Sequence, residues 1–281
     1  MSFEIDRLTP GDVDDAWHLS TQAGWNQTRG DWRRLLDLFP ETCFAGRIGD
    51  DLVATSTLAP YGDAVGWIGM VLVEENYRRR GYGGRIFERA LDAGLERDLG
   101  VIGLDATDAG AAVYEEYGFE PVTGIDRWEG IPEPPDSGPD ESAMREAPPA
   151  AEITAFDERR LGVDRSALLT HLLESADSTG FVLEREGEIA AYAIARPGRT
   201  CGQVGPVVGR DTEDVSALLA SIASRLDGRT IVDGIREEST VSLLESAGFE
   251  VQRRLNRMTH EEPAPALMGD GVVGAAGFEW G

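Results

Sequence analysis

The segment that most constrains the fold of this chain is residues 67–91, where an apolar strand pattern runs into a basic, glycine-rich turn and then an amphipathic helix. In the turn, Arg78, Gly81 and Gly83 have the spacing Arg-x-x-Gly-x-Gly. Glycines there let the backbone approach an anion closely, and the N–H groups of residues 79–84 can point toward it with the helix dipole behind them. The pattern predicts a pyrophosphate site at a helix N-terminus.

A second motif narrows the choice of ligand for this pyrophosphate site. An apolar run at 101–107 is followed by Tyr114-Glu-Glu-Tyr-Gly-Phe119. In this order the two motifs resemble the GNAT N-acetyltransferase superfamily, whose members carry Arg/Gln-x-x-Gly-x-Gly/Ala after the fourth strand and Tyr-x-x-x-Gly-Phe further on. Walker and Rossmann sites fit less well, because the chain has no Gly-Lys-Ser/Thr and no convincing acidic residue for a ribose. The resemblance implies acetyl-CoA as co-substrate, bound by Arg78, Arg79, Arg80, Gly81, Tyr82, Gly83 and Gly84.

The charge of the chain restricts its environment and its partners. It contains 51 Asp and Glu against 26 Lys and Arg, a formal net charge of -25, and all of its fixed cations are arginine. Such a surface repels itself in dilute salt and stays soluble in concentrated salt, which indicates a halophilic archaeon, with an acidic mesophilic protein as the alternative. Nucleic acid is excluded as a partner, because its phosphates would meet a negative surface.

Several other classes of protein are not indicated. The chain has no run of 18 or more apolar residues, and its first residues lack the basic and apolar regions of a signal peptide. Cys43 and Cys201 are far apart, and the three histidines have no metal-ligand spacing. We therefore expect a cytoplasmic protein without a metal or a membrane partner, and its oligomeric state stays open.

The order of the predicted elements indicates two similar modules. The first half reads as strand 3–7, two helices that include 31–39, a hairpin of 42–48 and 52–59, strand 67–73, helix 83–98 and strand 101–107. The second half repeats part of this order as a hairpin of 181–185 and 188–195, strand 203–208, helix 212–226 and strand 229–235. The predicted fold class is α/β (α+β), with two GNAT-like domains that each have a mixed, mostly antiparallel central sheet flanked by helices.

The boundaries follow from composition and from the motifs. Residues 131–150 contain six prolines and read as an extended linker. We expect a catalytic module at 1–130 (the first module), a degenerate GNAT-like module at 151–262 (the second module) and a C-terminal tail at 263–281. The second module has Gly209-Arg-Asp-Thr-Glu-Asp214 where the first has its glycine turn, and Leu244 at the position of the tyrosine. Those carboxylates would repel a pyrophosphate.

The resemblance also implies roles for individual residues. The backbone of Val71, Leu72 and Val73 would polarise the thioester carbonyl, and Tyr114 would protonate the departing thiolate. Family members often have an asparagine seven residues before this tyrosine, but here Thr107 and Asp108 stand there and suit a helix cap.

The base and the acceptor pocket are less well defined by the sequence. Glu74 directly follows the strand and is our choice of general base, with Asp63, Glu75 and Asp105 as competitors. Trp25 and Asn26 are candidates for the acceptor pocket. They belong to a wider resemblance to a subgroup of tandem GNAT proteins, carried by Gly24-Trp25-Asn26, Tyr61-Gly62-Asp63 and Arg257-Met258.

These assignments predict an acetyl-CoA-dependent N-acetyltransferase that uses direct attack in a ternary complex on a small-molecule or peptide amine. Two alternatives stay open at this point: a non-catalytic acyl-CoA-binding regulator, and an acyltransferase similar to mycothiol synthase, which is also a tandem GNAT protein.

The charge balance generates a prediction about stability. Dialysis from multimolar potassium chloride to low millimolar salt should lower the melting temperature, because repulsion between carboxylates becomes unscreened. Thermal unfolding followed by circular dichroism at matched pH measures this effect. An unchanged or higher melting temperature without salt would contradict adaptation to a salt-rich cytoplasm.

Overall fold

The structure is a computed structural model that describes residues 2–132, 144–226, 228–261 and 267–281. Its contacts divide the chain into two compact units: Met1–Leu104 with Trp280 (the first unit) and Asp105–Glu279 with Gly281 (the second unit). Helices cover mixed, mostly antiparallel sheets, which confirms the predicted fold class. The predicted module boundaries are a division of the sequence and remain predictions, and residues 133–143 of the expected linker lie outside the described residues.

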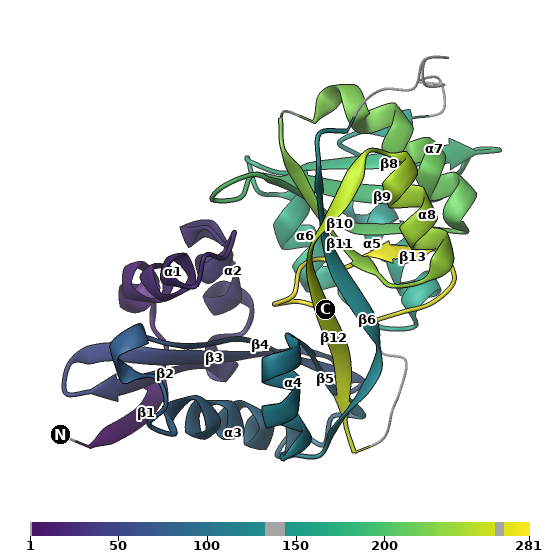
Figure 1. Ribbon diagram of the computed structural model, residues 1–281. Helices are drawn as coiled ribbons and strands as arrows, with labels where there is room; N and C mark the ends of the chain where they lie inside the picture. Colours follow the sequence, from purple (N-terminus) through teal and green to yellow (C-terminus); the bar gives the residue numbers. More distant parts are fainter. Residues whose placement is uncertain (1, 133–143, 227, 262–266) are drawn as a thin grey trace. The chain divides into compact units, whose positions relative to one another are not determined.

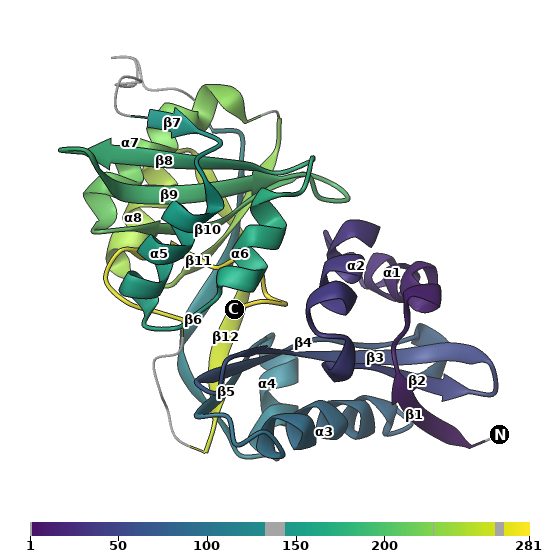
Figure 2. The same cartoon turned by 180° about the vertical axis from the view of Figure 1, so that it is seen from behind.

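The sheet of the first unit has the strand order β1, β2, β3, β4, β5. Neighbours are antiparallel as far as β4, whereas β5 joins β4 in parallel from Val65↔Val101 to Ile68↔Leu104. Figures 1 and 2 show α1 and α2 over one face of this sheet and α3 over the other. The elements are β1 (Phe3–Arg7), α1 (Val13–Gln22), α2 (Arg29–Leu38), β2 (Cys43–Ile48), β3 (Asp51–Tyr61), β4 (Val65–Val73), α3 (Tyr82–Leu95) and β5 (Val101–Ala106), with 3-10 turns η1 (Pro10–Asp12), η2 (Pro40–Thr42) and η3 (Glu75–Tyr77).

Local sequence explains where these helices begin. Thr28 and Asp31 form a capping box at the start of α2, in which the Thr28 backbone N–H donates to Asp31 over 2.8 Å and the Asp31 N–H donates to the Thr28 hydroxyl over 3.2 Å. α3 buries Ile86, Phe87 and Ala90 against the sheet, as its apolar spacing predicts. The predicted hairpin and the strand before the glycine turn are also present.

The second unit has the strand order β12, β6, β11, β13, β10, β9, β8, β7. Figures 1 and 2 show α7 and α8 over one face of this sheet and α5 and α6 over the other. The elements are α4 (Asp108–Glu115), β6 (Phe119–Gly130), β7 (Met144–Glu146), α5 (Ala150–Leu161), α6 (Ser166–Leu173), β8 (Thr179–Arg185), β9 (Glu188–Arg196), β10 (Gly202–Gly209), α7 (Thr212–Ile222), the 3-10 turn η5 (Ala223–Arg225), β11 (Thr230–Ile235), α8 (Glu238–Ser246), β12 (Phe249–His260) and β13 (Val272–Gly274).

The position of β6 is the main departure from a simple pair of modules. β6 follows the first module's helix α4, yet it lies between β11 and β12 and pairs antiparallel with both. A strand from the first module thus completes the second unit's sheet.

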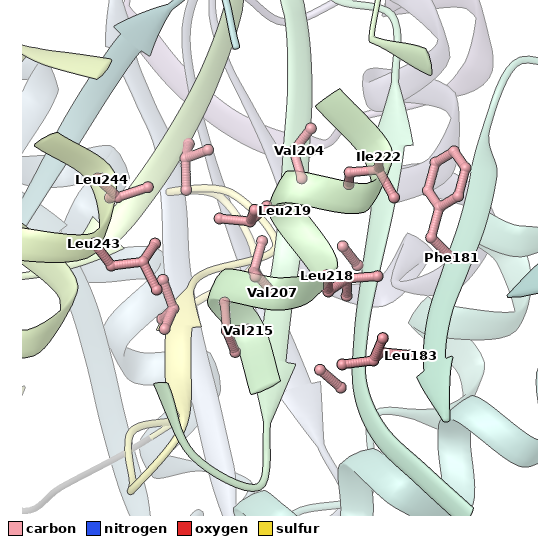
Figure 3. Close-up of a cluster of buried hydrophobic side chains, with 14 of the residues drawn as sticks. Phe181, Leu183, Val204, Val207, Val215, Leu218, Leu219, Ile222, Leu243 and Leu244 are labelled. Atoms are coloured by element: carbon pink, nitrogen blue, oxygen red, sulfur yellow. The ribbon is translucent and has the colours of Figure 1, made fainter. Parts of the chain in front are cut away.

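Apolar side chains from both layers form the core of the second unit. Figure 3 shows α7 residues Val215, Leu218 and Leu219 packed over the strands, with Leu243 and Leu244 of α8 beside them. Leu244, which stands at the tyrosine position of the second module, is fully buried in this cluster. The residue therefore has a packing role.

The second unit also contains buried ion pairs. Arg165 donates to both oxygens of Asp157, over 2.7 and 3.0 Å, and the Tyr192 hydroxyl donates to the same carboxylate. Arg127–Asp233 and Arg257–Asp105 have the same two-bond geometry and are similarly buried. Such pairs are costly to break, because removal of one partner leaves an uncompensated buried charge.

The Asp157–Arg165 pair generates a prediction. Asp157→Asn should lower the free energy of unfolding by about 3–5 kcal/mol, because the Arg165 charge stays buried without its counter-ion. Glu158→Gln, next in sequence and exposed, is the control and should change it by less than about 0.5 kcal/mol. Equilibrium urea unfolding at constant salt compares them, and equal midpoints for Asp157→Asn and the parent would show that the pair is not stabilising.

Candidate functional site

The predicted anion site forms a turn between β4 and α3, here called the anion turn (residues 78–84). Gly81 is the N-cap of α3 and has φ 80°, and Arg79 has φ 58°, so both are in the left-handed region. α3 then begins with Tyr82, Gly83, Gly84 and Arg85, which contribute no acidic side chain to its first turn. The first N–H groups of a helix lack intrahelical partners, so this terminus favours an external anion.

The glycines of the anion turn leave space rather than pack against protein. A Cβ built at Gly81 would meet no described atom within 4 Å, and one at Gly83 would meet only Val73 Cγ2, at 3.5 Å. Arg78 and Arg80 are exposed and donate to backbone oxygens of Val73 and Asn76, each over 2.9 Å. The turn can therefore admit a phosphate group close to its backbone, as binding of acetyl-CoA requires.

A bulge in β4 lies just before the anion turn. The register with β3 shifts between Thr57↔Gly69 and Thr55↔Leu72, and Met70 has φ 51°, which is uncommon for a non-glycine residue. The Thr55 hydroxyl donates to the Met70 carbonyl over 2.8 Å and holds this conformation. The parallel ladder with β5 ends at Ile68, so the backbone of Val71, Leu72 and Val73 lies beyond that ladder.

Glu74 is held by several donors. Its carboxylate accepts hydrogen bonds from Gln22 Nε2 over 3.2 Å and from the Asn76 backbone and side chain over 2.9 and 3.0 Å. Gln22 also accepts from the Glu75 N–H over 3.1 Å, so the last residue of α1 is joined to η3. Glu74 therefore caps this turn, and its role as base remains a prediction. The sequence did not single out Gln22, because nothing in its spacing marks a contact 52 residues away.

The competing carboxylates have different surroundings. Asp63 is exposed, and Glu75 is an exposed partner of Arg78 at 3.6 Å. Asp105 is fully buried in the second unit; burial raises its pKa, while Arg257 at 2.9 Å acts in the opposite direction. Both Asp105 oxygens accept hydrogen bonds from Arg257, so this carboxylate is engaged in a buried ion pair of the second unit.

Trp25 and Asn26 lie in the connection between α1 and α2. Gly24, with φ 75°, ends α1, and the Trp25 N–H donates to the Ser20 carbonyl over 2.9 Å. Trp25 is half-buried and Asn26 is buried. Because Gln22 belongs to the same helix end and contacts Glu74, this connection is tied to the residues that precede the anion turn.

Tyr114 belongs to the second unit, where it is half-buried on α4 with its ring 6.3 Å from Phe119. Burial raises the pKa of Tyr114 to about 12, so the phenol keeps its proton at neutral pH. α4 is capped by the Thr107 hydroxyl, which accepts from the Gly110 N–H over 3.3 Å. Asp108 accepts from Asn256 of β12 over 2.8 Å.

The corresponding turn of the second module is occupied by its own carboxylates. Asp211 caps α7 by accepting from the Asp214 N–H over 2.9 Å, and Glu213 and Asp214 lie in the first turn. Asp214 also pairs with Arg210, at 2.9 Å. The N-terminus of α7 therefore already has carboxylates of the chain itself as partners for its N–H groups and its dipole.

The strands beside that turn are also filled. β10 and β11 pair in parallel only at Gly202↔Thr230 and Gln203↔Ile231, and β13 then lies between them. β13 consists of residues from the expected tail, which the sequence pattern did not predict as a strand. In the second module β13 therefore pairs with the edge of β10 that corresponds, in the first module, to the edge of β4 beyond Ile68.

The described residues, 2–132, 144–226, 228–261 and 267–281, contain neither a membrane-spanning helix nor a cluster of metal-ligating side chains. No helix in these ranges is long and apolar enough to cross a membrane, and no group of three or more His, Cys, Asp or Glu side chains in them could hold a metal ion.

Comparison with known families identifies the chain. The model of the "Acetyltransferase (GNAT) family" matches residues 13–119, and that of the "Acetyltransferase (GNAT) domain" matches residues 153–270. The chain belongs to the GNAT superfamily. This GNAT protein is an acetyltransferase with two GNAT domains in tandem. Members of the GNAT family in general use acetyl-CoA.

Individual relatives agree with this assignment. The GNAT protein is 29% identical over 173 residues to holothin acyltransferase of Pseudoalteromonas sp. (strain SANK 73390), a match that covers 61% of this chain and 58% of that protein, less than two thirds of its length. It is 23% identical over 273 residues to the uncharacterized N-acetyltransferase YitH of Bacillus subtilis (strain 168), covering 95% and 94% of the two chains. In fold it is similar to a proposed acetyltransferase from Pyrococcus horikoshii, with a TM-score of 0.84 and 19% identity over 99% of this chain and 96% of that one.

Proposed function

We propose that this GNAT protein transfers the acetyl group of acetyl-CoA to a small-molecule or peptide amine by direct attack in a ternary complex. The contrast between its two helix termini carries the proposal. The anion turn has open glycines and no acid in the first helical turn, whereas the terminus of α7 is capped by Asp211 and surrounded by Glu213 and Asp214. The first module is therefore the proposed coenzyme site, and the second module is a degenerate partner that shapes or supports it.

The residues of the first module suit the coenzyme. The N–H groups of residues 79–84, with Arg78, Arg79 and Arg80, would bind the pyrophosphate. The backbone of Val71, Leu72 and Val73 would donate to the acyl carbonyl as negative charge develops on its oxygen. When bound, the coenzyme would supply the acetyl group as a thioester.

Two side chains would move protons in this scheme. Glu74, oriented by Gln22 and Asn76, would accept the proton of the acceptor's ammonium group, directly or through water. The amine nitrogen then bonds to the acyl carbon as the carbon–sulfur bond breaks, the nitrogen gives its second proton to solvent, and Tyr114 gives its proton to the departing sulfur. The products are an amide and a free thiol, and a proton returns from solvent to the tyrosine.

The acceptor is proposed by class. The relative named holothin acyltransferase supports acyl transfer as the reaction, and a small-molecule or peptide amine is the proposed acceptor. Trp25 and Asn26, in the connection between α1 and α2, are the proposed lining of the acceptor pocket. The net charge of -25, with arginine as the only fixed cation, supports function in a salt-rich cytoplasm such as that of a halophilic archaeon.

A screen of amine acceptors tests the reaction. Acetyl-CoA and the protein are incubated in multimolar potassium chloride with primary amines, amino acids and thiols, and the released thiol is measured. Acetyl-CoA-dependent thiol release with at least one amine supports the proposal. Binding of acetyl-CoA without turnover on any acceptor would favour a regulator, and turnover with thiols or amino-acyl acceptors alone would favour the activity of mycothiol synthase.

The anion turn generates a prediction about binding. Gly83→Asp should weaken acetyl-CoA binding roughly a hundredfold, about 2.7 kcal/mol, because a carboxylate enters the phosphate site. The helix itself should tolerate the change, since an acid in the first turn favours α3. Gly83→Ala is the matched control: its Cβ fits at 3.5 Å from Val73, so binding should stay within about threefold of the parent.

Calorimetric titration in high salt measures both variants, with one site per chain expected for the parent. Two equal sites in the parent, or undiminished binding by Gly83→Asp, would place the coenzyme elsewhere.

Tyr114 generates a prediction about turnover. Tyr114→Phe keeps the ring beside Phe119 but removes the proton donor, so kcat should fall roughly ten- to a thousandfold while affinity for acetyl-CoA changes little. Because burial raises the pKa of Tyr114 to about 12, its acid form persists as pH rises toward that value, and loss of its proton should not limit the parental rate below about pH 11. Leu244→Met, at the matching position of the second module, is the control and should keep the parental rate. Parental turnover by Tyr114→Phe with a reactive acceptor would make this tyrosine structural.

A further inference from the structure

A row of three charged residues crosses the centre of the second unit's sheet. In the strand register, Asp233 of β11 lies opposite Arg127 of β6, and Arg127 lies opposite Arg253 of β12. Residues directly opposite one another on neighbouring strands project from the same face. The three side chains therefore share one face, and two of them are cations placed side by side.

A bulge sets the position of Arg253. The register of β12 with β6 shifts between Val251↔Trp128 and Arg253↔Arg127, so Gln252 is an extra residue in the ladder. Bulges of this kind redirect the side chains that follow them. The β12 sequence thus uses an irregular ladder at the place where two like charges come to face each other, an arrangement that is unfavourable by itself.

The carboxylate of this row is already engaged. Arg127 donates from Nε and Nη2 to the two oxygens of Asp233, over 2.7 and 2.8 Å, and Gln203 donates to the same group over 3.2 Å. Asp233 is fully buried, and the ring of Phe278 lies 4.5 Å over the Arg127 guanidinium. The buried carboxylate of Glu279 also acts electrostatically on Arg127.

Arg253 differs from its neighbour. It is half-buried, and among the described residues it has no hydrogen bond or ion pair. Burial lowers its pKa, the Arg127 charge lowers it further, and Asp233 acts in the opposite direction. The guanidinium is thus partly desolvated without a bonded counter-ion, in a chain with 51 acidic side chains to 26 basic ones.

We propose that Arg253 is the recognition residue of a binding site in the second unit for a small ligand that carries a carboxylate. The planar guanidinium fork matches the two oxygens of a carboxylate, and Arg127 beside it adds positive potential. A phosphate dianion is disfavoured, because both of its negative charges would lie on one group close to Asp233 in the same row. The existence of the site can be tested without the proposed acetyl transfer, and its carboxylate comes either from the acceptor of that reaction or from a separate small molecule.

Thermal unfolding tests the site without any assay of acetyl transfer. The parent, Arg253→Gln and Arg254→Gln are compared in potassium acetate, potassium succinate, potassium chloride and potassium phosphate at equal ionic strength. Arg254 is the exposed neighbour of Arg253 on β12, so its variant removes the same charge from the same strand. The carboxylate salts should raise the melting temperature of the parent and of Arg254→Gln by about 2–4 °C relative to chloride, and should not raise that of Arg253→Gln.

The chloride arm separates a ligand site from a structural role. In chloride, Arg253→Gln should melt at or above the parental temperature, because the substitution removes a like-charge contact with Arg127. A lower melting temperature in chloride, or equal gains in carboxylate salts for the parent and Arg253→Gln, overturns the proposal. Stabilisation of the parent by phosphate but not by acetate or succinate overturns the ligand class.

A kinetic comparison then identifies the source of the carboxylate. If the acceptor carries it, Arg253→Gln should raise KM for carboxylate-bearing amines at least tenfold and leave KM for amines without a carboxylate unchanged. If a separate ligand carries it, both KM values stay at the parental level while the loss of thermal stabilisation persists. Either outcome, together with the melting result, supports the site.

Discussion

The pairing of β6 with β12 is the constraint on which the rest of this structure depends. β6 leaves the first module after α4, and its ladder with β12 runs from Phe249↔Gly130 to His260↔Phe119, while its other edge pairs with β11. Because a strand buried between two neighbours cannot be withdrawn without breaking both ladders, α4 and Tyr114 are fixed within the second unit. The family matches, 13–119 and 153–270, divide the sequence differently from the compact units, which separate at residues 104 and 105.

The same helix terminus has opposite chemistry in the two modules. Both α3 and α7 follow a strand, and the N–H groups of their first turn lack acceptors within the helix. In α3 these groups lie next to glycines and arginines, whereas in α7 they lie next to Asp211 and Asp214. A helix dipole favours any anion, and the choice between a ligand and the chain's own carboxylate rests on a few side chains. β13 pairs with the edge of β10, so in the second module both the helix terminus and the strand edge have partners from the chain itself.

Local patterns predicted what local forces determine. The sequence predicted four local features: the hairpin of β2 and β3, the strand β4, the anion turn and the cap at Thr107. Each depends on alternation, glycine spacing or a capping residue, and these act over a few positions. The β6 ladders, the three-residue strand β13 and the Gln22–Glu74 contact were not, because each joins segments far apart in the sequence. The left-handed Met70 was missed for a related reason, since its conformation is imposed by the register with β3 and by Thr55.

The charge composition and the buried ion pairs are related, because arginine supplies the cation of each pair. Arginine is the chain's only fixed cation, and Arg127, Arg165 and Arg257 each bind one buried aspartate through two parallel hydrogen bonds. Concentrated salt screens exposed charges strongly and buried pairs much less. The attraction within these buried pairs therefore persists at salt concentrations that screen the carboxylate-rich surface. Arg253 lies opposite Arg127 and has no ion pair with a carboxylate in the part of the chain that the structure describes. Among the described residues of β6 and β12, the buried guanidinium groups of Arg127 and Arg257 each bind an aspartate, and the proposed carboxylate ligand would give the half-buried Arg253 an equivalent partner.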